Sequence, residues 1–168
     1  NEWGHSLGFS QIGVADVDLQ ACESGLLAWL EAGFHGSMSY MARHGLRRAR
    51  PQALVPGTVR VITARMDYVP TDDEQLRDTA WATLSRADHA YVSVYARGRD
   101  YHKVMRKRLQ TLAERLEETV SPLGYRVFTD SAPVLEAALA VKSGQGWRGK
   151  HTLVLNRSSG SFFFLGEI

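Results

Sequence analysis

The stretch DYHKVMRKRLQTLAERLEETV, residues 100–120, decides the fold because it is the clearest helix in the sequence. Asp100 is suited to cap its start, because an aspartate oxygen can accept a hydrogen bond from a free backbone N–H in the first turn. The apolar residues recur at three- and four-residue spacing and predict one buried face: Tyr101, Val104, Met105, Leu109, Leu112, Leu116 and Val120.

The segment that leads into this helix carries an unusual mixture of side chains. Between Tyr95 and Arg108 there are two tyrosines, one aspartate and seven basic residues: Arg97, Arg99, His102, Lys103, Arg106, Lys107 and Arg108. A solvated helix does not need a Tyr–His pair at its start, and a buried helix cannot carry this much charge. The junction is therefore a candidate binding site.

Outward from this helix, alternating patterns and turn residues predict a mixed order of strands and helices. We expect strands at residues 8–17, 58–66, 90–96 and 124–130, and a hairpin of residues 151–156 and 161–168 around the turn at 157–160. We expect helices at residues 23–33, 37–45 and 131–144, the last with Pro133 in its first turn. Pro51 and Pro56 enclose a predicted loop, and residues 67–88 are predicted to be a surface loop with one or two helical turns. The fold class is α+β, with a mixed, mostly antiparallel sheet covered by helices.

Length and composition indicate one ordinary folded domain. The chain has 168 residues, of which 44% are apolar and 23% charged. No apolar run approaches the roughly 20 residues that span a bilayer, and the first residues lack the pattern of a signal peptide. Cys22 is the only cysteine, so the sequence has neither an intrachain disulfide nor a cysteine cluster for zinc or iron–sulfur. A cytoplasmic protein without a membrane partner is the simplest interpretation.

Basic residues form two clusters although the net charge is only +2. One cluster spans residues 43–50 and the other spans residues 97–108. Two solvated faces would explain this pattern, but charge separated by segment can also attract an anionic partner.

The segment GQGWRGKH, residues 144–151, matches two phosphate-binding patterns by its glycines and Lys150. Both patterns need a strand before the loop and a helix after it, so that the helix N-terminus faces the phosphate. Here a predicted helix precedes the loop and a predicted strand follows it, and His151 occupies the position of the magnesium-binding Ser or Thr. We therefore reject nucleotide binding. Asp130, between a predicted strand and a predicted helix, is either a helix cap or a functional carboxyl.

Several of these segments together resemble one family. YARGRDYHK (95–103), DSAPVLE (130–136) and GWRGKHTLVLNRSSGSFFFLGEI (146–168) are similar to the N-terminal domain of epoxyqueuosine reductase. HGSMSYMARHG (35–45), RARP (48–51) and LVPGTVRVI (54–62) fit the same pattern in the same order. The resemblance covers nearly the whole chain, and several of its motifs are long.

The resemblance implies the last step of queuosine biosynthesis, in which the epoxide oxygen of epoxyqueuosine at the wobble position of tRNA is removed by two-electron reduction. It implies cobalamin and two [4Fe–4S] clusters as cofactors. It also implies a nitroreductase-like cobalamin-binding fold, as in reductive dehalogenases. A ferredoxin-like cluster domain follows in the family, so residues 1–168 would be the cobalamin-binding catalytic domain of a fragment without cluster ligands. Val94 departs from the family, in which a basic residue often precedes the tyrosine.

The resemblance also implies roles for single residues. Asp130 matches the family's proton donor, and no protein metal ligand is expected because cobalt arrives chelated by the corrin. The expected cofactor-binding residues are Arg50, Tyr95, Tyr101, Asp130, Ser131, Gly149, Lys150, His151 and Thr152. The expected tRNA-binding residues are Arg47, Arg48, Arg97, Arg106 and Lys107. The partners would be tRNA carrying epoxyqueuosine and an unidentified electron donor, and the protein would be a monomer.

Three other functions are compatible with the residues. A reductive dehalogenase-like enzyme would act on a small molecule and have no affinity for tRNA. A non-catalytic corrinoid carrier would bind the cofactor and tolerate replacement of Asp130. A plain RNA-binding module would bind tRNA without a corrinoid spectrum.

Overall fold

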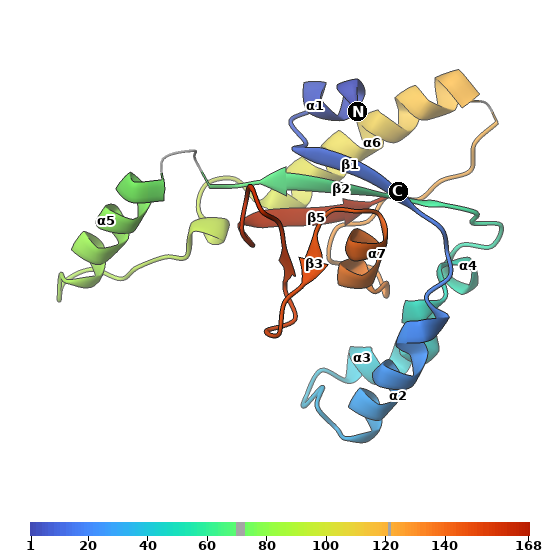
Figure 1. Cartoon of the computed structure of the whole chain (residues 1–168), viewed down its shortest axis with the longest axis horizontal. Coiled ribbons are helices and arrows are strands. Elements are labelled where there is room, and N and C mark those ends of the chain that lie inside the picture. Colours follow the sequence, from blue (N-terminus) through green and yellow to red (C-terminus); the bar gives the residue numbers. More distant parts are fainter. Residues whose placement is uncertain (70–72, 121) are drawn as a thin grey trace.

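The computed structural model describes residues 1–69, 73–120 and 122–168. Its centre is an antiparallel sheet of three strands in the order β1-β2-β5, where β1 is Gln11–Ala15, β2 is Val61–Asp67 and β5 is Phe163–Glu167. Helix α6 (Tyr101–Val120) covers one face and α7 (Glu136–Lys142) the other (Figure 1). This confirms the predicted α+β class with an antiparallel sheet.

Two hydrophobic cores flank the sheet because β2 is buried on both faces. On the α6 side, Ala64 and Met66 pack with Met105, Leu109 and Phe9. This arrangement confirms the predicted apolar face of the helix from Tyr101 to Leu116, but the inclusion of Val120 was wrong, because this residue at the helix end is exposed. On the α7 side, a second core contains Ala15, Leu19, Leu26, Ala49, Val61, Phe128, Ala132, Val134 and Leu139.

The remaining elements form a lobe and an arm on either side of α7 (Figure 1). The lobe contains a 3₁₀ turn (Gln20–Cys22), α2 (Glu23–Glu31), α3 (Ser39–His44), a second 3₁₀ turn (Gly45–Ala49) and α4 (Pro51–Leu54). The arm contains α5 (Asp73–Leu84) and the 3₁₀ turn η3 (Val94–Ala96). Helix α1 (Glu2–Ser6) packs beside β1, and a small hairpin pairs β3 (Trp147–Arg148) with β4 (Val154–Leu155).

Two predicted strands are wrong. Residues 90–96 contain η3 instead of a strand, and Val92 and Tyr95 are exposed. Residues 124–130 make one isolated bridge, Phe128 to Glu167. A β-branched or aromatic run forms a strand only where a neighbouring strand pairs with it, and neither segment has a continuous partner.

Other boundaries also differ from the predictions. The loop expected between Pro51 and Pro56 contains α4, and the loop expected at residues 67–88 contains the 12-residue helix α5, although residues 70–72 lie outside the described part of the chain. Helix α7 begins at Glu136 rather than at residue 131, because the residues before it form tight turns: Val134 donates its N–H to Ala132, and Leu135 donates its N–H to the Arg48 carbonyl.

The predicted C-terminal hairpin is also wrong, because its two halves pair with different strands. Val154 and Leu155 pair with β3, whereas β5 joins β2 in the main sheet. Only one bridge, Asn156 to Gly160, closes the turn between the two halves.

Candidate active site around Asp130

Asp130 lies at the centre of a group of hydrogen-bonding side chains. Its carboxylate Oδ2 accepts a hydrogen bond from the Tyr101 hydroxyl and lies 3.0 Å from Nε2 of His102. Both partners come from the first turn of α6, so the two adjacent residues reach one carboxylate. Asp130 itself has φ of 55°, a left-handed conformation that Asp tolerates better than most residues but that still needs support.

His102 connects Asp130 to a second carboxylate. Its Nδ1 lies 3.0 Å from Oδ1 of Asp100, which also accepts the backbone N–H of His102 at 3.0 Å. This second contact confirms Asp100 as the helix cap. The hydrogen bond from the His102 side chain holds the pKa of Asp100 below its ordinary value. The imidazole of His102, which lies between these two carboxylates, is therefore positioned to hold a proton beside Asp130.

Aromatic rings form a platform beside these polar groups. Tyr101 stacks on Phe164 of β5 with ring centroids 3.8 Å apart and planes 6° from parallel, and Tyr68 lies 4.6 Å from the same ring. Burial raises the pKa of Tyr101 far above its ordinary value, and its hydrogen bond to Asp130 acts in the same direction, so this hydroxyl keeps its proton. At the edge of the platform, Tyr95 is 51% and Phe162 is 49% exposed, which leaves aromatic surface available to a ligand.

Two further acids lie near Asp130, and the sequence analysis did not select either of them. Glu167 of β5 is 1% exposed, and neither carboxylate oxygen has a hydrogen-bond partner. Burial raises its pKa well above the usual range, and the charges of Glu136 and Asp130 add to this effect. Burial, followed by the charge of Asp130, also raises the pKa of Glu136 to about 7. The sequence signal that could have identified Glu167 is its position as an acidic residue inside the apolar segment FFFLGEI.

The predicted basic residues occupy different environments. Arg47 and Lys107 are exposed, and Arg106 donates from Nη2 to the Ser131 hydroxyl at 3.0 Å. Arg97 lies over the ring of Tyr91. In contrast, Arg48 is only 7% exposed.

Arg50, predicted to bind the cofactor, forms an ion pair with Glu23 at 2.7 Å. This pairing lowers the pKa of Glu23 by a direct hydrogen bond. Gly149, Lys150, His151 and Thr152 follow β3 and lead into β4, on a different element from Asp130. Ser131 directly follows Asp130, where Arg106 contacts it.

The glycine-rich segment has the topology that argues against phosphate binding. Helix α7 precedes it, and strand β4 follows it. A side chain at Gly146 would collide with the backbone oxygen of Leu155 in β4. A side chain at Gly149 would meet the ring of His151 at 2.6 Å. These two glycines therefore allow the hairpin to close on itself.

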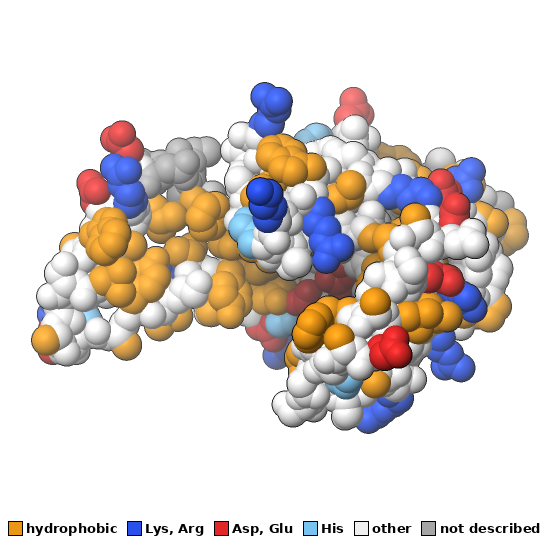
Figure 2. Space-filling model, turned by 60° about the horizontal axis from the view of Figure 1, so that its bottom comes forward, with side chains coloured by type: hydrophobic (Ala, Val, Ile, Leu, Met, Phe, Trp, Pro, Cys, Tyr) orange, Lys and Arg blue, Asp and Glu red, His pale blue; other side chains and the backbone are white. Residues whose placement is uncertain are grey.

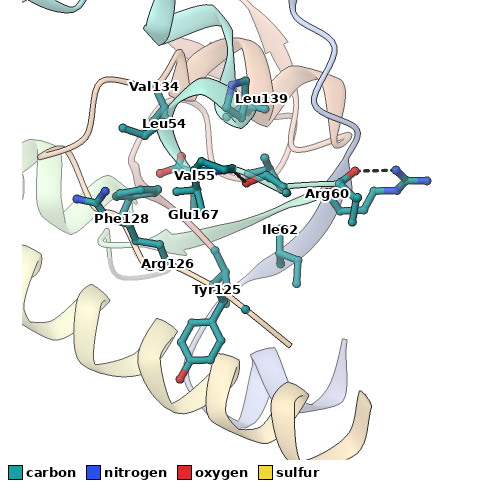
Figure 3. A pocket seen from close by; sticks show the side chains of 18 of the residues that line it. Leu54, Val55, Arg60, Ile62, Tyr125, Arg126, Phe128, Val134, Leu139 and Glu167 are labelled. Atoms are coloured by element: carbon teal, nitrogen blue, oxygen red, sulfur yellow. Dashed lines mark hydrogen bonds between the residues drawn. The ribbon is translucent and has the colours of Figure 1, made fainter. Parts of the chain in front are cut away.

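A separate apolar cavity of about 510 Å³ lies between α4, the start of β2 and residues 123–128 (Figure 3). Asp130, Tyr101 and His102 do not line it. Glu167 reaches its wall among Leu54, Val134 and Leu139. The buried carboxyl group of Glu167 thus lines the cavity and also lies within electrostatic range of Asp130.

In the described parts of the chain, no group of three or more His, Cys, Asp or Glu side chains is arranged to hold a metal ion. Among the described helices, none has the length and apolar character needed to cross a membrane.

Comparison with known proteins identifies the family. The family model described as epoxyqueuosine reductase QueG, DUF1730, matches residues 48–131, which include the start of α6 and Asp130. This chain belongs to the epoxyqueuosine reductase family. The epoxyqueuosine reductase of Alicycliphilus denitrificans is 68% identical over 99% of this chain, which covers 46% of that relative. The chain therefore spans less than half the length of this curated relative.

Solved structures of the epoxyqueuosine reductase family share this fold. The enzyme from Streptococcus thermophilus matches 99% of this chain and 43% of its own, with a TM-score of 0.76 at 22% identity. A second epoxyqueuosine reductase, solved with an epoxyqueuosine-modified tRNA-Tyr stem loop, matches 99% of this chain and 42% of its own, with a TM-score of 0.75 at 20% identity.

Glu167, which is buried, and Glu136, which is partly buried, predict a pH-dependent stability of this epoxyqueuosine reductase family member. Because the pKa of Glu136 is raised from 4.5 to about 7, the folded state binds more protons than the unfolded state between these values. We therefore expect the free energy of unfolding to fall by on the order of 2 kcal/mol between pH 5 and pH 8. Glu167 acts in the same direction. Urea unfolding of the chain at several pH values would measure the change.

The variant Glu167→Gln should reduce this fall, because the amide does not titrate. Glu118→Gln, on the exposed end of α6, is the matched control and should keep the parent's dependence. A parent protein whose stability is constant from pH 5 to pH 8 would contradict the prediction.

Proposed function

We propose that residues 1–168 are the cobalamin-binding catalytic domain of an enzyme that reduces epoxyqueuosine to queuosine in tRNA. The supporting observation is the carboxyl group of Asp130, held by Tyr101 and His102 beside a partly exposed aromatic platform. The family of this chain, and similar relatives named epoxyqueuosine reductases, support this reaction.

The residues around Asp130 fit a large, flat and partly apolar ligand such as cobalamin. Tyr95 and Phe162 expose aromatic surface next to the stacked pair of Tyr101 and Phe164. Figure 2 shows apolar side chains along the arm and acidic side chains recessed between the arm and the lobe. Aromatic rings can cover the ring edge of a corrin while their hydroxyls bind its amides.

The proposed cobalamin contacts come from three parts of the chain. Tyr95 and Tyr101 would bind from the arm and α6, and Ser131 from the loop after Asp130. The turn before β4 would contribute Gly149, Lys150, His151 and Thr152. Arg50 would have to exchange its ion pair with Glu23 to reach the ligand. Bound cobalamin would supply the two-electron reducing chemistry.

The proposed chemical role of the chain is to deliver a proton. Removal of the epoxide oxygen consumes two electrons and two protons and releases that oxygen as water. Asp130 would donate one proton to the oxygen as the carbon–oxygen bond breaks, because an alkoxide is a poor leaving group without it. Tyr101 orients the carboxyl group and keeps its own proton. His102, between Asp100 and Asp130, would hold the next proton beside the acid.

The electrons would come from outside these residues. Cys22 is the only cysteine in the sequence, so this chain has no ligand set for a [4Fe–4S] cluster. We infer that two such clusters belong to the part of the longer enzyme that this chain does not span, and that an unidentified electron donor reduces them.

The proposed tRNA interface consists of exposed basic residues near the site. Arg106 contacts Ser131 next to Asp130, and Lys107 follows it on α6. Arg47 and Arg97 would add contacts from the lobe and the arm. Arg48 is buried, so the interface is proposed without it. The similar structure solved with a modified tRNA stem loop supports tRNA as the partner.

We expect the 168-residue chain to bind cobalamin without turning over epoxyqueuosine. After mixing with cobalamin and removal of free ligand, the protein should keep the visible absorption of a corrinoid. His151→Ala should weaken binding, whereas His5→Ala, on α1, should not. A protein fraction without corrinoid absorption would contradict the cofactor proposal, and multiple turnovers with a physiological reductant would contradict the need for clusters.

Asp130→Asn should abolish proton donation and preserve the fold, because Asn also tolerates the left-handed conformation. In a longer reductase that carries this sequence, we expect turnover to fall by roughly 10²–10⁴-fold, with cobalamin binding unchanged. Asp88→Asn, on an exposed acid of the arm, is the matched control. A rate equal to the parent's would mean that the proton comes from another group.

Replacement of both Arg106 and Lys107 by alanine should weaken tRNA binding and reduce its dependence on salt. Each lost phosphate contact reduces the steepness of the plot of log affinity against log salt concentration by about 0.7 to 0.9. The measurement is a titration of tRNA at several salt concentrations. Arg60→Ala, an exposed arginine that lines the separate cavity, should leave the slope unchanged. If the double variant keeps the parent's slope, Arg106 and Lys107 do not contact tRNA and are only solvent-exposed surface charges.

A further inference from the structure

A polar hollow of about 400 Å³ lies between α6 and residues 125–131, beside the turn that carries Asp130. Asp130 itself does not line it. Apart from Val127 and Phe128, its wall consists of five polar side chains: Arg106, Gln110, Tyr125, Arg126 and Ser131. Two of the five are arginines and none is an acid, so the hollow carries an excess of positive charge.

The two arginines reach the polar hollow from different segments. Arg106, on α6, donates from Nη2 to the Ser131 hydroxyl at 3.0 Å. The Arg126 guanidinium lies over the ring of Phe128, 4.9 Å from its centroid. In the described part of the chain, neither guanidinium forms an ion pair with an acid. Two positive charges that face one hollow without a counter-charge attract an anion.

The hydroxyl groups in the wall accept hydrogen bonds from their neighbours and keep their own protons for a ligand. Gln110 donates from Nε2 to the Tyr125 hydroxyl at 2.9 Å and to Oε1 of Glu114 at 3.0 Å. The Ser131 hydroxyl accepts from Arg106. A hydroxyl group has one proton to donate in addition to its lone pairs, so both O–H groups can donate into the hollow.

Positive charge and hydrogen-bond donors from several directions are the features that recognise a phosphate group. A guanidinium donates in a planar fork that matches two phosphate oxygens, and charge-assisted hydrogen bonds are stronger than neutral ones. The two hydroxyl protons add donors at other angles, which suits a tetrahedral group of oxygens. Arg106, Arg126 and the neighbouring Lys107 are all exposed, and such a spread of surface charge suits a long polyanion.

We propose that the polar hollow binds a phosphodiester of an RNA backbone. Arg106 and Arg126 supply the charge, and the hydroxyl groups of Tyr125 and Ser131 donate to the phosphate oxygens. The assignment to RNA rests on the proposed function, in which Asp130 protonates a nucleoside of tRNA. It adds Arg126 and Tyr125 to the proposed tRNA interface. The nucleotide tail of cobalamin also contains a phosphodiester, so the experiments must distinguish these two sources.

Inorganic phosphate is the probe for the hollow itself, with the isolated 168-residue chain observed by NMR. The Nε–H signals of Arg106 and Arg126 should shift with phosphate and reach saturation, whereas sodium chloride at the same ionic strength should not shift them. Arg126→Ala should weaken phosphate binding by about 3- to 10-fold. Arg60→Ala, which removes an arginine of the apolar cavity only, should bind as the parent does. Equal responses to phosphate and chloride would overturn the proposal.

Tyr125→Phe tests the hydroxyl donor with the least change to the fold, because it keeps the ring. Phosphate affinity should fall by about 2- to 10-fold, as expected for the loss of one hydrogen bond. Tyr91→Phe, outside the hollow, is the matched control and should bind phosphate as the parent does. If Arg126→Ala does not fold, this variant still decides the question. Unchanged affinity in Tyr125→Phe would overturn the proposed set of donors.

Titrations with tRNA and with cobalamin identify the source of the phosphate. Arg126→Ala should reduce the steepness of the plot of log tRNA affinity against log salt concentration by about 0.7 to 0.9 and leave cobalamin binding unchanged. Arg60→Ala should change neither. If Arg126→Ala weakens cobalamin binding and leaves tRNA binding unchanged, the assignment to RNA is overturned. A chain that binds phosphate and tRNA in this hollow but retains no corrinoid would refute the proposed cofactor and support the present inference.

Discussion

The close approach of α6 to β5 at Gly166 is the contact on which the site depends. A side chain at this position would meet Cδ1 of Leu109 at 2.7 Å and Cε of Met105 at 3.0 Å. Because Gly166 has none, both core residues of α6 pack directly on the strand. This seats the start of the helix above Phe164, where Tyr101 stacks on that ring. The Tyr101 hydroxyl is thereby placed at Asp130.

The same strand brings an acidic side chain into the interior. Glu167 follows Gly166 and pairs through its backbone with Phe128, two residues before Asp130. Its side chain alternates to the α7 face, as successive strand residues do, and becomes buried without a partner. A buried acid without hydrogen bonds is costly when ionised, so it keeps its proton. Together with Glu136, it places two proton-binding groups behind the exposed carboxylate of Asp130.

Prediction from the sequence succeeded where structure is local. Helix α6 follows from spacing within one segment, and its cap follows from Asp100. The segments at residues 90–96 and 124–130 look equally regular, yet they are not strands, because a strand also needs a neighbour and no local pattern supplies one. The start of α7 was misplaced because the N–H of Leu135 bonds to the Arg48 carbonyl from a distant segment, a contact that no local pattern shows.

By itself, the sequence determined the fold class, the main helix, the family and the candidates Asp130 and Tyr101, because these depend on residue types in consecutive positions. Only the tertiary structure decided which residues meet. It joined Tyr101 and His102 to Asp130 across 29 and 28 positions, buried Arg48, paired Arg50 with Glu23 and brought Glu136 and Glu167 behind the site. The physical reason is that burial and charge interactions arise between segments that are distant in sequence, and a pattern within one segment contains no information about its neighbours.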